Sequence, residues 1–173
     1  MVFILVFLTS FLISYILTPH ARNFAIWLGS IDKPGARRIH QTAVPSSGGM
    51  AIFLGFLLSI LIYSRMNQLV LGILLGGFFI FIVGLIDDLY EISPRLKLFG
   101  QVVAAVIPLL FGVNIAFITN PMGGMFYLGY WGIPLTILWI VGITNTVNLI
   151  DGLDGLAAGI STIAALTLFL VGL

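Results

Sequence analysis

Six long apolar stretches dominate this chain, and each has about the length of a membrane-spanning helix. A helix that crosses a bilayer needs about 20 mostly apolar residues, with a range of about 17–25. The six stretches are Met1–Leu17, Gly48–Ser64, Leu69–Ile86, Leu98–Ile118, Tyr130–Val147 and Leu156–Leu173. We therefore predict an all-α fold, a single polytopic membrane domain over residues 1–173 with about six transmembrane helices.

The composition excludes a soluble protein. Hydrophobic residues make up 60% of the 173 residues and charged residues only 8%, whereas a soluble domain carries about 25% charged residues. The net charge is +1 and there is no basic run, so nucleic acid is not an expected partner. Cys is absent, which excludes thiolate chemistry. The first apolar stretch lacks the basic residues and the cleavage site of a removable signal peptide.

Basic residues gather on one side of the predicted membrane. The connections 18–47 and 87–97 carry six Lys and Arg residues, against one in 65–68 and 119–129. The positive-inside rule then places the first pair of connections in the cytoplasm and the amino terminus outside an inner (plasma) membrane. Alternation puts the connection 148–155 on the cytoplasmic side too, so every Asp falls on one face. These acids are Asp32, Asp87, Asp88, Asp151 and Asp154.

Two adjacent acids, Asp87 and Asp88, directly follow the third apolar stretch, where hydrocarbon gives way to water. Two like charges are costly there unless they share a cation. Mg²⁺ prefers oxygen ligands and binds through one or two carboxylates together with substrate phosphates. Lys97, ten residues beyond Asp87, offers a compact positive charge to a phosphate. An acid pair that merely marks the membrane interface is the alternative.

A second polar motif, N-T-V-N-L-I-D-G-L-D-G-L-A-A-G, covers residues 145–159. Helical steps of three place Asn148 beside Asp151. The glycines that follow each Asp predict a break in the helix, which would fold Asp151 and Asp154 toward one point. Asp154 is also placed to cap the sixth helix.

Polar residues inside apolar stretches also hold neighbouring helices together by hydrogen bonds. This is the alternative for Asn145 and Asn148, with the glycines of the motif as packing surfaces. Gln101 lies one turn into the fourth stretch. It fits a contact between helices and a contact with a ligand equally well.

The long connection carries D-K-P-G-A-R-R-I-H over residues 32–40. Arg37 and Arg38 offer forked donors that suit phosphate oxygens. His40 is a candidate to titrate or to bind an anion. The alternative is that these residues only contact lipid head groups on the cytoplasmic side.

Three segments, residues 32–49, 87–101 and 145–159, resemble the polyprenyl-phosphate N-acetylhexosamine-1-phosphate transferase superfamily, glycosyltransferase family 4. The third segment reads almost continuously as the signature of the family. The resemblance is narrowest to the bacterial undecaprenyl-phosphate N-acetylglucosamine-1-phosphate transferase branch. It implies transfer of a sugar-1-phosphate, GlcNAc-1-phosphate in that branch, from a UDP-sugar to a polyprenyl phosphate lipid. UMP is released, and the product serves cell-envelope glycans such as teichoic acid or lipopolysaccharide.

The resemblance also implies a cofactor, further partners and residue roles. Mg²⁺ is the expected cofactor, with Mn²⁺ as an alternative, and a second copy of the chain is a candidate partner in the bilayer. Asp87 and Asp88 would be catalytic, and Asp88, Asn148 and Asp151 would hold the metal. The expected substrate-binding residues are Lys33, Arg37, Arg38, His40, Lys97, Asn148 and Asp154.

The chain departs from the family in one respect. Members carry further helices and loops with another metal-binding Asp and a His-rich segment, but here no Asp follows Asp154 and no His follows His40. We therefore expect the amino-terminal part of a longer transferase, inactive in isolation. A cation-coupled transporter and a non-catalytic membrane fragment are the alternatives. Transporter acids lie near the membrane midplane, whereas these acids lie at the ends of the predicted spans.

Overall fold

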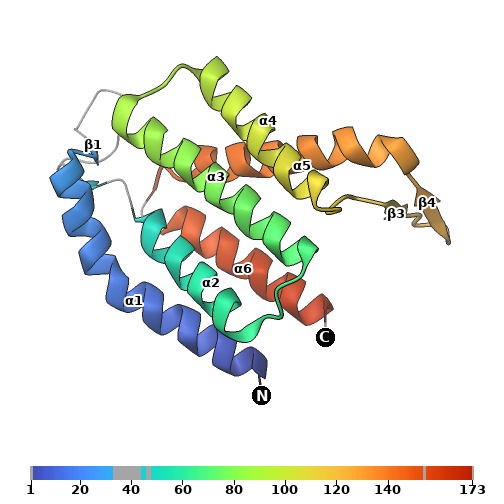
Figure 1. Ribbon diagram of the computed structural model, residues 1–173, viewed down its shortest axis with the longest axis horizontal. Helices are drawn as coiled ribbons and strands as arrows, with labels where there is room; N and C mark the ends of the chain where they lie inside the picture. The colour runs from blue at the N-terminus through green and yellow to red at the C-terminus, as the bar shows by residue number, and fades with distance from the viewer. Residues whose placement is uncertain (1, 33–43, 46–47, 154, 173) are drawn as a thin grey trace.

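Six α-helices form in the residues that the structure describes, which are 2–32, 44–45, 48–153 and 155–172 of a computed structural model (Figure 1). They are α1 (Val2–Leu28), α2 (Gly49–Tyr63), α3 (Gln68–Tyr90), α4 (Pro94–Leu110), α5 (Gly132–Ile150) and α6 (Leu156–Val171). The predicted all-α fold and the order of its helices are confirmed. Three of the helices, α1, α3 and α4, have bounds that differ clearly from the prediction.

The first helix is longer than predicted. The apolar stretch ends near Leu17, but α1 continues through Pro19 to Leu28. Ala21 and Ala25 lie one turn apart in this extension, and both are buried. The packing of these small residues therefore stabilises the extension. The length of an apolar stretch does not predict such packing.

The fourth helix begins earlier and ends earlier than predicted. Ser93 occupies its N-cap, where the hydroxyl accepts a hydrogen bond from the Leu96 amide at 3.4 Å, and Pro94 takes the first turn. Both residue types favour a helix start at these positions. After Leu110 the chain reaches Gly112 with φ of +87°, a backbone conformation that favours glycine. The helix therefore stops before the rest of the predicted apolar stretch.

The remaining apolar residues of that stretch enter a β-hairpin. Strand β3 (Phe117–Thr119) pairs antiparallel with β4 (Met125–Tyr127), with Ile118 opposite Phe126. Gly123 and Gly124 form the turn with positive φ angles. A short 3-10 helix, η1 (Gly129–Trp131), then leads into α5, and the hairpin projects from the helices (Figure 1).

A second, shorter ladder closes the long connection after α1. Strand β1 (Ile31–Asp32) pairs antiparallel with β2 (Val44–Pro45). The ladder holds the two ends of residues 33–43 together beside the end of α1. Residues 33–43 themselves lie outside the described part of the chain.

Small residues let the helices approach closely. A Cβ placed on Gly76 of α3 would lie 2.5 Å from Pro108 Cγ of α4, and one placed on Gly55 of α2 would overlap Ser14 of α1. Such close contacts are typical of helices in membranes, where small residues replace the large apolar core of a soluble protein. The buried apolar side chains are accordingly mostly alanines.

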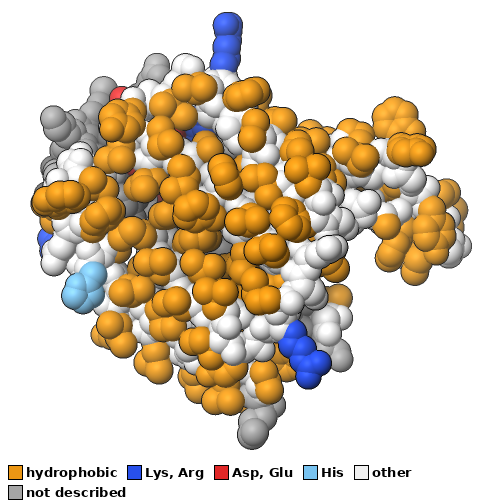
Figure 2. All heavy atoms as spheres, viewed as in Figure 1, with side chains coloured by type: hydrophobic (Ala, Val, Ile, Leu, Met, Phe, Trp, Pro, Cys, Tyr) orange, Lys and Arg blue, Asp and Glu red, His pale blue; other side chains and the backbone are white. Residues whose placement is uncertain are grey.

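The large apolar side chains face outward. Figure 2 shows them covering most of one face of the molecule. By length and composition, three described helices are able to cross a membrane, Val2–Leu28, Gln68–Tyr90 and Gly129–Ile150, and Gly49–Tyr63 and Leu156–Val171 are shorter apolar helices. Because a lipid-facing surface has this composition, the chain is a helical membrane protein.

Candidate active site

The polar site is built where the end of α3, the start of α4 and the end of α5 meet. The sequence places Asp87 and Asp88 in a connection, but α3 continues to Tyr90 and holds both acids in its last turns. Glu91 ends the helix in the left-handed conformation, with φ of 44°. Successive helical residues differ by about 100° in direction. Asp87 is accordingly half-buried, while Asp88 is exposed.

Lys97 joins the three helices. Its Nζ donates to Asp87 Oδ2 at 2.7 Å and to Asn148 Oδ1 at 2.8 Å. The side chains of Lys97 and Asp87 are only 18% and 24% exposed, so the ion pair is largely shielded from water. We call Asp87, Lys97 and Asn148 the three-helix cluster.

The cluster brings a carboxylate oxygen and an amide oxygen to one cationic centre. Both oxygens lie within 2.8 Å of the ammonium nitrogen. These are hard oxygen donors of the kind that Mg²⁺ and Mn²⁺ accept. The carboxylate oxygen of Asp87 and the amide oxygen of Asn148 are therefore chemically suited to bind a divalent cation. Lys97 supplies the positive charge that the two oxygens share in this structure.

The other predicted metal ligands lie near the ends of the same helices. Asp151 is the C-cap of α5, three residues after Asn148, and is exposed. No hydrogen bond or ion pair joins Asp151 to another described residue. Within the described residues, no group of three or more His, Cys, Asp and Glu side chains is close enough to hold a metal. A cation would therefore need oxygen ligands beyond the acids alone.

The predicted break in the second motif is confirmed. Helix α5 ends at Ile150 and α6 begins at Leu156, with Gly155 between them at φ of +76°. The N-cap of α6 is Gly155 and not Asp154, because the left-handed backbone at that position favours glycine. Asp154 lies outside the described residues.

A second polar contact joins α4 and α5 one helical turn away from the three-helix cluster. Asn145 Nδ2 donates to Gln101 Oε1 at 2.6 Å and to the carbonyl oxygen of Val141 at 2.8 Å. Gln101 Nε2 lies 3.4 Å from Asn145 Oδ1, and Gln101 is 2% exposed. Gln101 therefore makes a contact between helices. The sequence left this role undecided.

The spacing of the polar residues along α4 and α5 is consistent with the pairs Lys97–Asn148 and Gln101–Asn145. Lys97 and Gln101 are four residues apart on α4, and Asn145 and Asn148 are three apart on α5. Residues at these spacings share one face of a helix. Two such faces in contact give two successive pairs, as observed.

The predicted basic substrate-binding residues fall in the long connection between α1 and α2. Lys33, Arg37, Arg38 and His40 lie outside the described residues. The ends of that connection are fixed by the β1–β2 ladder, to which Asp32 contributes its backbone.

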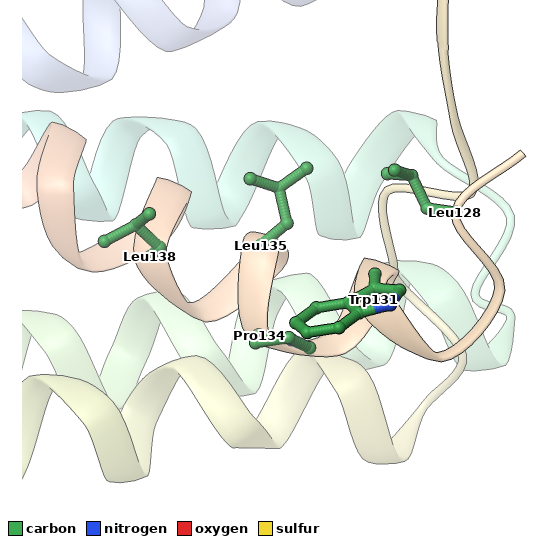
Figure 3. A pocket seen from close by; sticks show the side chains of 5 residues that line it. All are labelled: Leu128, Trp131, Pro134, Leu135 and Leu138. Carbon is green, nitrogen blue, oxygen red and sulfur yellow. The ribbon is translucent and has the colours of Figure 1, made fainter. Parts of the chain in front are cut away.

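An apolar pocket lies at the other end of α5. It is lined by Leu128, Trp131, Pro134, Leu135 and Leu138, and its volume is about 310 Å³ (Figure 3). Its lining is apolar, and it lies at the amino-terminal end of α5, whereas Asn148 lies near the carboxy-terminal end. The pocket is therefore separate from the three-helix cluster.

The chain is thus a helical membrane protein in which an acid, an amide and a lysine meet at the ends of three helices. The family model described as "Glycosyl transferase family 4" matches residues 70–173. The matched segment holds the whole three-helix cluster. The chain belongs to this family.

Curated relatives match nearly the whole chain. A Bacillus subtilis protein named "Probable undecaprenyl-phosphate N-acetylglucosaminyl 1-phosphate transferase" is 39% identical over 98% of this chain and 48% of its own length. A Mycobacterium tuberculosis protein named "Decaprenyl-phosphate N-acetylglucosaminephosphotransferase" is 36% identical over 98% of this chain and 45% of its own length. A Thermotoga maritima protein named "Undecaprenyl-phosphate alpha-N-acetylglucosaminyl 1-phosphate transferase" is 34% identical over 90% of this chain and 48% of its own length. The chain thus spans about half the length of the curated relatives it matches.

Proposed function

We propose that this chain forms the amino-terminal half of an enzyme that transfers GlcNAc-1-phosphate from UDP-GlcNAc to undecaprenyl phosphate. In the net reaction, a P–O bond forms between the lipid phosphate and the sugar-bearing phosphorus, and the P–O bond from that phosphorus to UMP breaks. The observation that carries the proposal is Lys97 held between Asp87 and Asn148 at the helix ends. The names of the relatives point to the same chemistry.

The position of the cluster suits this pair of substrates. A polyprenyl phosphate keeps its chain in the bilayer and its phosphate at the surface, whereas a UDP-sugar arrives from water. The Lys/Arg asymmetry of the sequence supports a cytoplasmic position of the cluster in a plasma membrane. The two phosphate groups would meet at the ends of α3 and α5.

The residues of the cluster divide the work of phosphoryl transfer, which depends mainly on positioning and charge neutralisation. Lys97 uses two of its three N–H donors on Asp87 and Asn148. The third donor is available to a substrate phosphate, and the two contacts fix its direction. Asp88, exposed on the next helical position, is the candidate to orient the lipid phosphate.

A divalent cation, Mg²⁺ or Mn²⁺, fits the oxygen donors at this site. Asp88, Asn148 and Asp151 are the residues that would hold it, and it would neutralise negative charge on the phosphates. Lys33, Arg37, Arg38, His40 and Asp154 are proposed as further substrate-binding residues. The lipid-linked product would serve an envelope glycan such as teichoic acid or lipopolysaccharide.

The test is a transfer assay in membranes. We define the extended chain as residues 1–173 joined to the carboxy-terminal half of the Bacillus subtilis relative. The extended chain, given undecaprenyl phosphate and labelled UDP-GlcNAc, is expected to form a lipid-extractable sugar and to release UMP in equal amount. Label that stays in the aqueous phase, in membranes that contain folded extended chain, would contradict the proposal.

A further inference from the structure

The β3–β4 hairpin exposes an unusual amount of aromatic and apolar surface. Met122 at its tip is 97% exposed, Tyr127 in β4 is 79% exposed, and Tyr130 in the adjoining η1 is 92% exposed. All six strand residues are exposed, so both faces of the sheet are at least partly open. Figure 2 shows the hairpin as a projecting lobe covered by apolar side chains.

The hairpin carries no charge that would favour water. The sequence has no Asp, Glu, Lys, Arg or His between Lys97 and Asp151. A loop that projects into water usually presents polar side chains, and an exposed apolar hairpin edge is prone to aggregation. Both faces of this hairpin therefore need an apolar environment.

The hairpin is continuous with a membrane-spanning segment. The span Gly129–Ile150 includes η1 and begins two residues after β4. Tyr130 and Trp131 lie at its start, with Trp131 77% exposed. Tyr and Trp at the end of a span favour the boundary between hydrocarbon and water. The apolar surface continues from Trp131 into the pocket beside Leu135 (Figure 3).

The backbone of the hairpin limits how deep it can lie. A two-stranded sheet has two outer edges, whose N–H and C=O groups need water or lipid head groups. The turn satisfies its own groups, because Asn120 Oδ1 accepts from the Met122 amide at 3.0 Å and the Asn120 amide donates to the Gly124 carbonyl at 3.1 Å. These features suit the interfacial layer of a bilayer and exclude the hydrocarbon centre.

We propose that the β3–β4 hairpin lies in the interfacial layer of the lipid bilayer beside the start of α5, where its aromatic side chains anchor that end of the helix. The partner is the lipid itself, through apolar contact and not through charge. Because the hairpin is uncharged, the contact is independent of the content of anionic lipid.

Single-cysteine labelling tests the proposal, since the chain has no native Cys. Met122→Cys carries a fluorophore at the tip of the hairpin. Met66→Cys, at a second exposed methionine in the short connection between α2 and α3, is the matched control. The 173-residue chain is reconstituted in phosphatidylcholine vesicles. Each label is then quenched by iodide in water and, separately, by lipids that carry a nitroxide near the head group.

The label at position 122 is expected to be quenched several-fold more by the nitroxide lipid than the label at position 66, and several-fold less by iodide. Equal quenching of both labels by iodide, without quenching by lipid, would place the hairpin in water and overturn the proposal. Protection of the label at position 122 from both quenchers would show that protein covers the hairpin, and would overturn it equally.

A second pair of variants tests the apolar contact in the Met122→Cys background. Phe126→Asn removes an exposed aromatic side chain from β4 and is expected to raise iodide quenching. Thr119→Asn replaces one exposed polar side chain on β3 with another and is expected to leave it unchanged. Equal iodide quenching of both variants would show that the aromatic surface does not anchor the hairpin.

Discussion

Gln101 and Asn145 hydrogen-bond across the interface between α4 and α5, with Asn145 Nδ2 2.6 Å from Gln101 Oε1. Gln101 is buried and Asn145 is half-buried, so the contact between them is largely shielded from water. The pair lies one turn from Lys97 and Asn148 and fixes the register in which those two residues meet.

Gln101→Leu is expected to destabilise the helices because Asn145 loses its contacts with Gln101 across the interface and keeps only the bond from its Nδ2 to the Val141 carbonyl. An unsatisfied buried polar group costs about 1–3 kcal/mol, and interhelical hydrogen bonds in membranes average about 0.6 kcal/mol. Thermal unfolding in detergent measures the change. Asn145→Leu should be destabilising too, while the double variant Gln101→Leu/Asn145→Leu should recover stability, because two apolar groups replace the polar pair. Strictly additive losses would contradict the coupling.

Gly76→Ala is expected to destabilise the contact between α3 and α4. The added Cβ would lie 2.5 Å from Pro108 Cγ and 2.7 Å from Pro108 Cδ, and overpacking of this kind costs about 1–3 kcal/mol. Gly84→Ala, on the same helix with no atom within 4 Å of its added Cβ, is the control. It is expected to be neutral or stabilising, because alanine favours helix more than glycine. Equal unfolding temperatures for the two variants would contradict the packing described here.

Asp88→Asn and Asp151→Asn are each expected to lower transfer by the extended chain. Each variant keeps the shape of the side chain but loses a charge for cation and phosphate binding, and loss of one such interaction costs about 10²–10³ in rate. Both should also raise the Mg²⁺ concentration needed for half-maximal rate. Glu91→Gln, an exposed acid beside the same helix end, should keep most of the activity. Normal turnover and normal Mg²⁺ dependence of either Asp variant, with normal expression, would remove its assigned role.

Residues 1–173 alone are expected to bind nucleotide weakly and to give no sustained transfer. The relatives are about twice as long as the segment that they share with this chain, and polar groups left facing lipid cost several kcal/mol each. The isolated chain and the extended chain are compared with labelled UDP-GlcNAc in the same membranes. Transfer at equal rates would show that the shared half is sufficient.

Much of the fold was predictable because apolar length and helical period act locally. The six helices and the break at Gly152–Gly155 follow from such patterns. The extension of α1 does not follow from these patterns, because it depends on the packing of buried Ala25. The early end of α4 does not follow either, because it depends on the left-handed backbone of Gly112. The sequence did not predict the β3–β4 hairpin, because Phe117 and Ile118 are as apolar as the residues of a membrane-spanning helix.

The site was predictable in its residue types and less so in its contacts. The spacing of the residues indicated Asp87 and Lys97 as members of one motif, and only the family resemblance added Asn148 to the same site. The sequence did not indicate that Lys97 bonds to both of the others, because that contact depends on how α3, α4 and α5 pack. Distances between helices are a tertiary property that spacing along one helix does not fix.

The central claim is that Lys97, held by Asp87 and Asn148, is part of the site of phosphoryl transfer. Arg95 is the matched control, because it is a cation two residues away that lies exposed on the first turn of the same helix. The direct measurement is the rate of labelled GlcNAc-1-phosphate transfer to undecaprenyl phosphate by the extended chain carrying Lys97→Met or Arg95→Met. The account predicts a loss of about 10²–10³ for Lys97→Met, as for loss of one central electrostatic contact, and nearly full activity for Arg95→Met. Equal activity of the two variants, at equal amounts of folded protein, would contradict it.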